Sequence, residues 1–217
     1  MNEKITFWSH RGYKVNKRAN SRGSLIEAHN KGYRNIEFDL WYLNGNLRLN
    51  HDKPKKEEIK NLPLLRKYLK QYGSKLKYWM DFKNLNKNNI ENVLLILKRE
   101  LDKNQIPYDN ANFAPYERDL NKSLFLLNKA EGFLKGINLV SVIDSNVIKN
   151  NNLQSLYKFY SKNKIKHLSV ESKIIDEKFI KLFKDIKIYA WTVDDKKELD
   201  RLKELGIKNI CTNLLLP

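Results

Sequence analysis

The sequence contains a single cysteine, Cys211, among 217 residues. One cysteine cannot form an internal disulfide, so a disulfide-bonded framework is excluded and a reducing compartment is compatible with the chain. No apolar stretch approaches the roughly 20 residues of a membrane-spanning helix. The segment "MNEK" leads into "ITFWSH" without a positively charged leader before an apolar run. We therefore expect a cytoplasmic protein that does not span a membrane.

Acidic residues are scarce beside basic ones, because 25 Asp and Glu stand against 42 Lys and Arg and give a formal net charge of +17. Such a charge attracts polyanions, including nucleic acid, anionic lipid and phosphorylated substrates. The lysines are nevertheless spread through the whole chain together with asparagine and isoleucine, which indicates a compositional bias of the source genome. No basic cluster is interleaved with aromatic residues as in a stacking platform. We therefore expect no nucleic-acid partner.

Linkers, low-complexity tracts and charge blocks are also absent from the chain. Apolar residues make up 41% and charged residues 31% of it, which argues against disorder and against a collagen-like protein. The length is within the range of one α/β barrel. We therefore expect one globular domain over residues 1–217.

What the sequence does contain is an alternation of short apolar runs with longer stretches of helical periodicity, which is typical of βα repeats and a parallel sheet. The predicted strands are residues 5–9, 35–40, 47–50, 77–82, 111–114, 137–142, 167–170, 187–192 and 209–212. The predicted helices are residues 24–31, 62–72, 90–103, 120–131, 153–161, 173–184 and 196–205. The sequence predicts a polar loop at residues 146–153.

One of the nine strands belongs to a hairpin, since Asn44-Gly45 lies between two alternating runs and is a strong signal for a tight turn. The eight other strands match the count of a (β/α)8 TIM barrel with a short β-hairpin after the second strand. An open, doubly wound sheet is the alternative. In a barrel, catalytic groups belong at the carboxyl ends of the strands.

Ionisable residues follow the first two strands at these ends. His10 and Arg11 lie just past strand 5–9. Glu37 and Asp39 are two residues apart, so both carboxylates point to the same face of their strand, where a hard divalent cation would relieve their repulsion. A structural histidine and a solvated acidic face are the alternatives for these residues.

The hairpin brings His51 and Asp52 back toward this acidic pair, and the register of the turn decides which way His51 points. A two-residue Asn44-Gly45 turn places His51 opposite Phe38, on the face away from the acids. A three-residue loop with a G1 bulge places it opposite Glu37. A functional role for His51 therefore predicts the bulged turn.

The next strand, 77–82, ends in "KYWMDFK". Asp81 and Lys83 share a face at its carboxyl end, where Asp81 could complete a three-carboxylate metal shell and Lys83 could meet a phosphate. A salt-bridged surface pair is the alternative. Such groups at four consecutive strand ends are much less expected by chance than any one of them alone.

Four segments carry a family resemblance: "SHRGY", "NSRGSLIEAHNKGYRNIEFDLWYLNGNLRLNHD", "LPLLRKYLKQYGSKLKYWMDFK" and "YAWTVDDKKELDRLKELGIKNICTN". In this order they resemble the signature segments of the glycerophosphodiester phosphodiesterase family, and they cover about half of the chain. The resemblance implies a (β/α)8 barrel that hydrolyses a phosphodiester with a divalent metal, Mg2+ or Ca2+, in lipid or glycerol metabolism. It also implies roles for single residues: acid/base histidines at His10 and His51, metal ligands at Glu37, Asp39 and Asp81, and phosphate contacts at Arg11 and Lys83.

The sequence departs from the family pattern in three places. Asp81 replaces the usual glutamate, and "ANS" at 19–21 lacks the glutamate that commonly precedes the asparagine. Only 30 positions separate His51 from Asp81, where family members commonly insert a longer segment, so we expect an open cleft suited to a larger or polymeric diester. Trp191 would offer an apolar wall for a glycerol or sugar face, or pack as barrel core. We interpret His29 and His167 as structural.

The expected reaction is the cleavage of a glycerophosphodiester, or a related small or polymeric diester, to an alcohol and a phosphomonoester. Two histidines near neutrality can supply one base and one acid. The nucleophile is water or a neighbouring hydroxyl, which would form a cyclic phosphate first. Two alternatives stay open. One is a phospholipase D-like lyase on the same scaffold, although such lyases are disulfide-bonded and this chain has a single cysteine. The other is a non-catalytic barrel that binds phosphorylated ligands.

Overall fold

The strands form where short runs of β-branched and aromatic residues provide two faces of alternating side chains. A computed structural model describes residues 4–13 and 18–217. Within these residues all nine predicted strands are present, with ends within three positions of those expected. They are β1 (Thr6–His10), β2 (Asn35–Leu43), β3 (Asn46–Leu49), β4 (Lys77–Phe82), β5 (Ala111–Pro115), β6 (Asn138–Ile143), β7 (His167–Glu171), β8 (Lys187–Trp191) and β9 (Asn209–Thr212).

Helices follow most strands, and several begin at a side chain that accepts hydrogen bonds from the first free backbone N–H groups. Asp119, Asp176 and Asp195 cap α4, α7 and α8 in this way. The helices are α1 (Arg22–Asn30), α2 (Leu65–Leu69), α3 (Ile90–Lys103), α4 (Leu120–Phe133), α5 (Ser145–Asn150), α6 (Leu153–Lys162), α7 (Glu177–Leu182) and α8 (Lys196–Glu204). Short 3-10 turns are η1 (Ile59–Asn61), η2 (Gly73–Lys75), η3 (Tyr108–Asn110) and η4 (Ser172–Ile174).

The prediction of a polar loop at residues 146–153 is wrong, because Ser145–Asn150 form helix α5. The Asp144 side chain accepts hydrogen bonds from the backbone N–H groups of Asn146 and Val147, which starts the helix, and Val147 is buried. The cap therefore outweighs the polar composition of the segment. Helices α2 and α7 are shorter than predicted, and η4 occupies the beginning of the stretch expected as α7.

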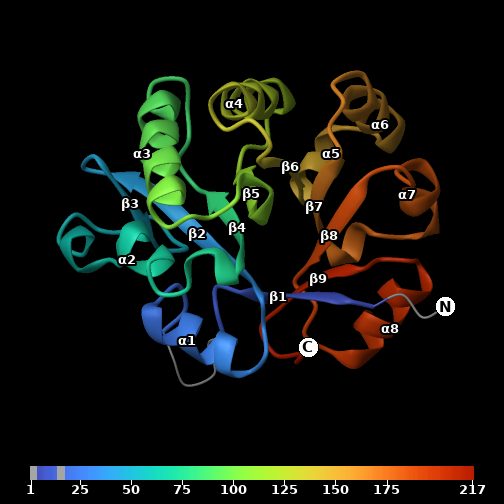
Figure 1. Ribbon diagram of the computed structural model, residues 1–217. Coiled ribbons are helices and arrows are strands. Elements are labelled where there is room, and N and C mark those ends of the chain that lie inside the picture. Colours follow the sequence, from blue (N-terminus) through green and yellow to red (C-terminus); the bar gives the residue numbers. More distant parts are fainter. Residues whose placement is uncertain (1–3, 14–17) are drawn as a thin grey trace.

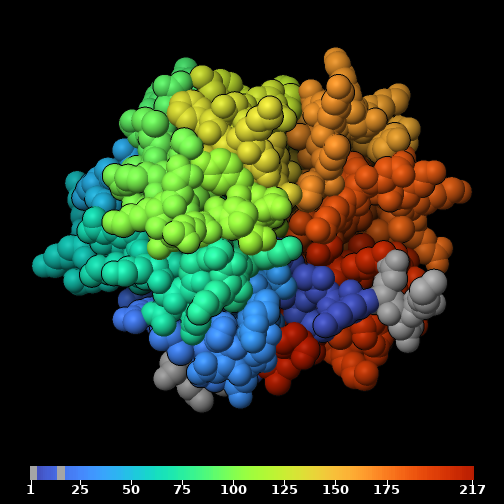
Figure 2. All heavy atoms as spheres, in the orientation of Figure 1, coloured from blue at the N-terminus to red at the C-terminus, as the bar shows by residue number. Residues whose placement is uncertain are grey.

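The eight strands other than β3 are parallel and close into a barrel (Figure 1). Around it they follow the order β1, β9, β8, β7, β6, β5, β4 and β2, and β2 pairs with β1 to complete the ring. Figure 2 shows the closure from outside, where the dark blue N-terminal atoms lie against the red C-terminal part of the chain. The predicted (β/α)8 barrel with an added hairpin is thus confirmed, and the open sheet is excluded.

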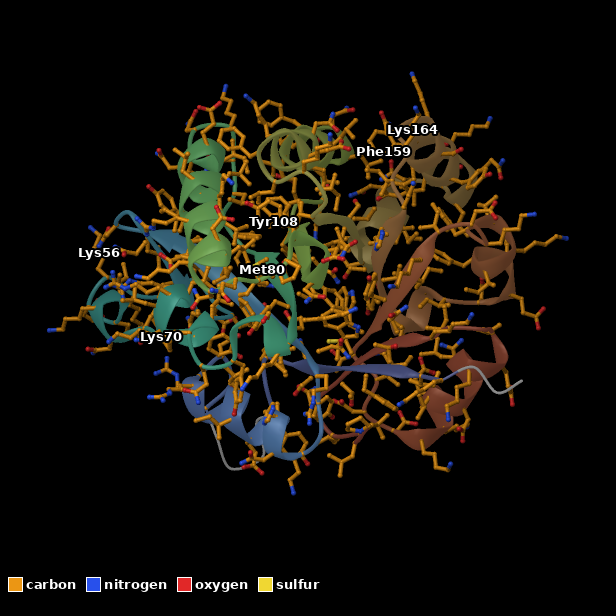
Figure 3. The ribbon with its side chains drawn as sticks, viewed as in Figure 1. Lys56, Lys70, Met80, Tyr108, Phe159 and Lys164 are labelled. Carbon is orange, nitrogen blue, oxygen red and sulfur yellow. The ribbon has the colours of Figure 1, made fainter. Side chains whose placement is uncertain are left out.

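Side chains alternate between two apolar layers. Outward residues such as Ile36, Phe38 and Met80 are buried between the strands and the helices. Figure 3 shows Met80 in this layer, while Lys56 and Lys164 lie at the periphery. Inside the barrel a smaller cluster closes the centre below the carboxyl rim. Its members are Trp8, Trp79, Ala114, Val140, Val142, Tyr189 and Cys211. This packed floor leaves only the two ends of the barrel for ligands.

The prediction of a bulged turn in the hairpin is wrong. Leu43 pairs with Asn46, and both turn residues have positive φ, 50° at Asn44 and 71° at Gly45, which is a two-residue turn of the type I′ kind. The pairing nevertheless ends at Leu40 and Leu49. His51 therefore lies beyond the ladder, where strand register no longer dictates the direction of its side chain.

No helix in the described ranges combines the length and apolar character needed to cross a bilayer.

His167 begins β7 at the end of the barrel opposite the carboxyl rim, and its Nδ1 lies 3.3 Å from the Tyr189 hydroxyl. Burial, followed by the charges of Lys187 and Lys166, lowers its pKa from 6.5 to about 4. The unfolded chain therefore binds more protons than the folded one between these values, so the folded state loses stability as the pH falls through this window.

We expect the free energy of unfolding to fall by roughly 2 kcal/mol more in the wild type than in His167→Gln over this window, after allowance for the partial exposure of the ring. Urea titrations at a series of pH values measure the difference. His29→Gln serves as the matched control, since His29 lies near the protein surface on α1. Parallel curves for the wild type and His167→Gln would contradict the prediction.

Candidate active site

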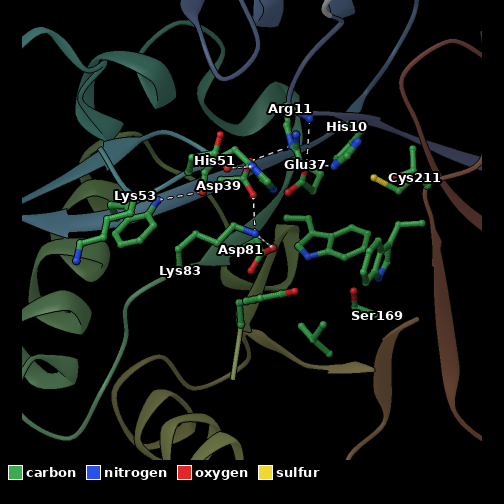
Figure 4. Close-up of a pocket in the computed structure, with 17 residues that line it drawn as sticks. His10, Arg11, Glu37, Asp39, His51, Lys53, Asp81, Lys83, Ser169 and Cys211 are labelled. Atoms are coloured by element: carbon green, nitrogen blue, oxygen red, sulfur yellow. Dashed lines mark hydrogen bonds and ion pairs between the residues drawn. The ribbon is translucent and has the colours of Figure 1, made fainter. Parts of the chain in front are cut away.

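A cavity of about 390 Å³ opens at the carboxyl ends of the barrel strands (Figure 4). All of the residues for which the sequence predicts a role line this one cavity, although they are up to 181 positions apart. They are His10, Arg11, Glu37, Asp39, His51, Asp81, Lys83 and Trp191. The fold therefore brings the predicted set together.

Three carboxylates form the acidic centre of the cavity. Glu37 and Asp39 come from β2, and Asp81 is the Cα partner of Asp39 on the adjacent strand β4. Each offers one oxygen, and the three oxygens lie within 4.8 Å of one another. The two-residue spacing on β2 and the parallel register with β4 are sufficient to explain this convergence.

Two cations lie among these acids. Lys83 Nζ is 2.6 Å from Asp81 Oδ2 and 2.9 Å from Asp39 Oδ1, so it bridges the two aspartates. Arg11 Nε lies 3.1 Å from Asp39 Oδ2 as an ion pair outside hydrogen-bonding geometry, and the Arg11 backbone N–H donates to Glu37 Oε2 at 2.9 Å. The cations thus share the acidic centre instead of pointing freely into the cavity.

The site shifts the pKa values of the three acids in different directions. Burial raises the pKa of Glu37 well above its usual value, and the nearby Asp39 and Asp81 raise it further. Burial also raises the pKa of Asp81, against the opposing charge of Lys83. At Asp39 burial is outweighed by Lys83 and Arg11, which hold its pKa below the usual value. Asp39 is therefore the carboxylate that the protein itself keeps charged.

His10 is held by a chain of polar contacts from the end of β9. Its Nδ1 lies 3.1 Å from Asn213 Oδ1, and its Nε2 lies 3.8 Å from Glu37 Oε2. The Asn213 side-chain amide donates to Asp194 Oδ2 and its backbone N–H donates to Asp194 Oδ1, both at 2.6 Å. Since an amide oxygen only accepts, this contact places a proton on Nδ1 and leaves Nε2 for the cavity.

His51 lies at the mouth of the same cavity, with 42% of its side chain exposed. Its Nδ1 is 2.8 Å from Asp52 Oδ1, and its backbone carbonyl accepts a hydrogen bond from Trp41 Nε1 at 3.3 Å. Asn50 Nδ2 donates to the carbonyl of Asp52 at 2.8 Å. These loop contacts, in place of the strand register, set the position of His51.

Asn20 is a residue of the site that the sequence argument missed. It is buried, and its side chain binds Asp39 twice: Nδ2 donates to Asp39 Oδ2 at 2.8 Å, and Oδ1 accepts from the Asp39 backbone N–H at 3.1 Å. Its φ of 55° lies in the left-handed region that asparagine tolerates. The "ANS" segment therefore keeps a supporting role without the family glutamate. Asn213 and Asp194 were missed as well, although the quoted "WTVDD" and "CTN" segments contain them.

Gly12 allows the turn that presents His10 and Arg11. Its φ is +69°, and an added Cβ would lie 2.6 Å from Ser24 Oγ and 2.8 Å from the Ser24 carbonyl carbon. Backbone atoms cannot move away as a flexible side chain can, so only glycine fits between the end of β1 and the start of α1.

Aromatic rings form the remaining wall. Trp191 lines the cavity at the end of β8 and packs against the inner cluster, and Tyr116 lines the cavity after β5. Lys83 Nζ lies 4.4 Å from the centroid of the Tyr116 ring, so a cation–π contact adds to its two aspartate contacts.

The donor set fits a hard divalent cation. Carboxylate oxygens are the ligands that Mg2+ and Ca2+ prefer. Asp81 Oδ1 is buried and has no hydrogen-bond partner among the described residues, which leaves one acceptor in the cluster for a ligand. Asp81 is thus close enough to the β2 acids to act with them despite being one methylene shorter than glutamate.

Comparison with solved structures identifies the architecture. A glycerophosphodiester phosphodiesterase from Thermotoga maritima has 17% sequence identity and a TM-score of 0.76, with 98% of this chain and 96% of that chain covered. One from Parabacteroides distasonis has 17% identity and a TM-score of 0.75, with 97% and 94% covered. The chain has the fold of these phosphodiesterases.

A third phosphodiesterase of this fold, from Oleispira antarctica, was solved in complex with its product sn-glycerol-3-phosphate. It has 16% identity and a TM-score of 0.73, with 96% of this chain and 92% of that chain covered. No family model matches the sequence, and no curated protein matches it either. The similarity to these phosphodiesterases is therefore one of fold, and an activity can be inferred only from the residues of the cavity.

Proposed function

We propose that the protein is a metal-dependent phosphodiesterase that cleaves glycerophosphodiesters or related diesters to an alcohol and a phosphomonoester. The observation that carries this proposal is the convergence of two histidines, three carboxylates and two cations on one cavity at the carboxyl rim. Binding alone would need the cations, but it would not need two imidazoles beside a metal-type carboxylate cluster.

The residues of the cavity have different proposed roles. Glu37, Asp39 and Asp81 would hold a divalent ion, which supplies Lewis-acid stabilisation of charge on the phosphoryl oxygens when bound. Arg11 and Lys83 orient the anionic diester and offset the charge that develops in the transition state. Trp191 and Tyr116 exclude water from one side and give the alcohol portion an apolar face.

The two histidines move the protons. His10 Nε2 faces the acidic centre because its Nδ1 is committed to Asn213, and His51 exposes its ring at the mouth beside Asp52. One neutral imidazole takes a proton from the nucleophile, and one protonated imidazole returns a proton to the leaving alcohol. The nucleophile is water, or a substrate hydroxyl next to the phosphate that would give a cyclic phosphate first.

Product analysis by phosphorus NMR over a panel of glycerophosphodiesters tests the proposal. We expect a phosphomonoester to accumulate with Mg2+, Ca2+ or Mn2+ and to stop accumulating after addition of a chelator. A persistent cyclic phosphate would favour the lyase on this scaffold. A protein that is inert with all three metals on every diester would refute the proposal and favour a binding role.

The pair Asp194 and Asn213 provides a prediction of its own. Asn213→Asp alone places a second carboxylate against Asp194, at atoms that are now 2.6 Å apart as donor and acceptor, so we expect kcat to fall by roughly one to two orders of magnitude. Adding Asp194→Asn restores a donor and acceptor pair and should recover most of the loss. The double-mutant cycle in kcat measures the coupling. Additive effects would show that the pair does not orient His10.

A further inference from the structure

The end of the barrel opposite the active site is more strongly positive than the active-site rim. Seven helix-to-strand connections contain nine lysines and arginines but only two acids. Over the described residues, the strand-to-helix connections of the active-site rim contain ten cations and nine acids. The helix-to-strand connections are residues 31–34, 70–76, 104–110, 134–137, 163–166, 183–186 and 205–208. A uniform compositional bias does not predict such a difference between the two ends.

Helix dipoles explain part of this asymmetry, since lysines are favoured near helix C-termini. Lys77 and Lys187 add two further cations at this end, and they are the first residues of strands β4 and β8, so helix dipoles do not explain them. Lys77 shares a face with Trp79, and Lys187 shares a face with Tyr189, and both of these rings lie inside the barrel. Both lysines are therefore directed into the mouth of the barrel at its N-terminal end.

These two lysines face each other across that mouth. Three strands separate β4 from β8 on either side of the ring. The neighbouring inward positions at this end contain amide, imidazole or hydroxyl groups, and none of them is a carboxylate: Thr6, Asn35, Asn138, His167 and Asn209. The mouth is thus a ring of donors and neutral polar groups around two cations.

Within the described part of the chain, Lys77, Lys166 and Lys187 form no ion pair, as no carboxylate lies within 4.0 Å of their ammonium groups. Lys187 Nζ lies 5.3 Å from the centroid of the Tyr189 ring, and the Tyr189 hydroxyl contacts His167, the Cα partner of Lys187. Burial and the charge of Lys77 lower the pKa of Lys187. The cations therefore repel one another, and no carboxylate of the described residues within 4.0 Å offsets this repulsion.

We propose that the N-terminal mouth of the barrel is a binding site for a phosphoryl anion, held between Lys77 and Lys187 and separate from the catalytic cavity. Ammonium groups that approach from opposite sides need an anion with oxygens on opposite sides. A tetrahedral phosphoryl group presents oxygens in this way, whereas a carboxylate presents both of its oxygens on one side. The site does not depend on the proposed activity.

The site can be observed directly by reductive methylation of the full-length protein with ¹³C-formaldehyde, which gives each lysine its own NMR signal. Lys77→Arg and Lys187→Arg assign the two signals of the mouth. We expect both signals to shift saturably with inorganic phosphate, and the signal of Lys196, exposed on α8, to follow ionic strength alone. If chloride at equal ionic strength produces the same shifts, the site does not exist.

A pair of double variants separates the mouth from general charge effects. Lys77→Gln/Lys187→Gln should fold at least as stably as the wild type, since it removes like-charge repulsion, but should lose the extra rise in melting temperature that phosphate gives over chloride. Lys196→Gln/Lys197→Gln removes the same charge from α8 and should keep that rise. Equal responses in the two variants would overturn the proposal.

Vesicles identify the source of the phosphoryl group. Cosedimentation of the wild type with phosphatidylglycerol vesicles but not phosphatidylcholine vesicles, lost in Lys77→Gln/Lys187→Gln, would assign the site to a lipid headgroup. A response to free phosphate without vesicle binding would assign it to a small phosphorylated ligand. If the protein neither binds these vesicles nor responds to free phosphate, the phosphoryl site does not exist, whatever the outcome of the activity assays.

Discussion

Asp39→Asn is expected to reduce diester hydrolysis by roughly a thousandfold and to lower the free energy of unfolding by about 3 kcal/mol. Asp39 is 1% exposed and contacts Lys83, Arg11 and Asn20. An asparagine cannot balance the two cations, because Arg11 loses the carboxylate that its guanidinium contacts and Lys83 is left with Asp81 alone. Steady-state kinetics at saturating metal and urea unfolding of the metal-free protein give the two numbers.

Glu37→Gln is the informative comparison, because the same chemical change on the same strand should have the opposite effect on stability. The raised pKa of Glu37 means that its charge disfavours the folded state at neutral pH. We therefore expect Glu37→Gln to stabilise the metal-free protein while still abolishing metal-dependent activity. Asp52→Asn, at a side chain that is 88% exposed, should change stability by less than about 0.5 kcal/mol.

Either of two results would contradict this account of the acidic centre. One is an Asp39→Asn enzyme with wild-type kcat at saturating metal, which would remove Asp39 from the metal site. The other is a loss of stability in Glu37→Gln equal to that in Asp39→Asn, which would mean that the two carboxylates are held in the same charge state.

His10→Ala is expected to reduce kcat by roughly three orders of magnitude with little change in stability. The ring borders the cavity, so its removal enlarges an existing space and does not open a new hole in the core. His29→Ala is the matched control, because that imidazole stacks on Tyr72 at 4.3 Å between ring centroids, away from the cavity, and should leave kcat unchanged.

The leaving group separates the roles of His10 and His51. p-Nitrophenolate leaves without a proton, so the variant that lacks the general acid should retain much of its activity on bis-p-nitrophenyl phosphate. The variant that lacks the general base should lose activity on this diester and on glycerophosphodiesters alike. If both histidine variants keep wild-type rates on glycerophosphodiesters, two-histidine catalysis is refuted.

The strand positions and the acidic centre could be predicted because both follow from local rules. Alternation places Glu37 and Asp39 on one face of a strand, and a parallel neighbour brings Asp81 to the same level. Neither step needs knowledge of distant contacts beyond the order of the strands. The helix α5 was missed because one cap, Asp144, outweighs a polar composition.

His51 lies at the predicted cavity although the register predicted for its hairpin is wrong. A role for His51 predicted a G1 bulge, yet the turn has two residues, and His51 reaches the cavity because the ladder ends before it. Its position depends on hydrogen bonds with Trp41 and Asp52. These bonds belong to a loop, and a loop has no sequence periodicity from which they could be predicted. Asn20 and Asn213 were missed for a related reason, since each holds a side chain of the cavity, Asp39 or His10, through tertiary hydrogen bonds.

By itself, the sequence determined the alternation of strands and helices, the barrel and the face of the strand on which Glu37, Asp39 and Asp81 lie, because these depend on periods of two and about 3.6 residues. The tertiary structure alone decided which acids stay charged, how His10 and His51 are held, and that Lys77 and Lys187 lie at the same end of the barrel on opposite sides of the ring. Such properties arise from burial and from charges brought together by closure of the ring. No local pattern contains them.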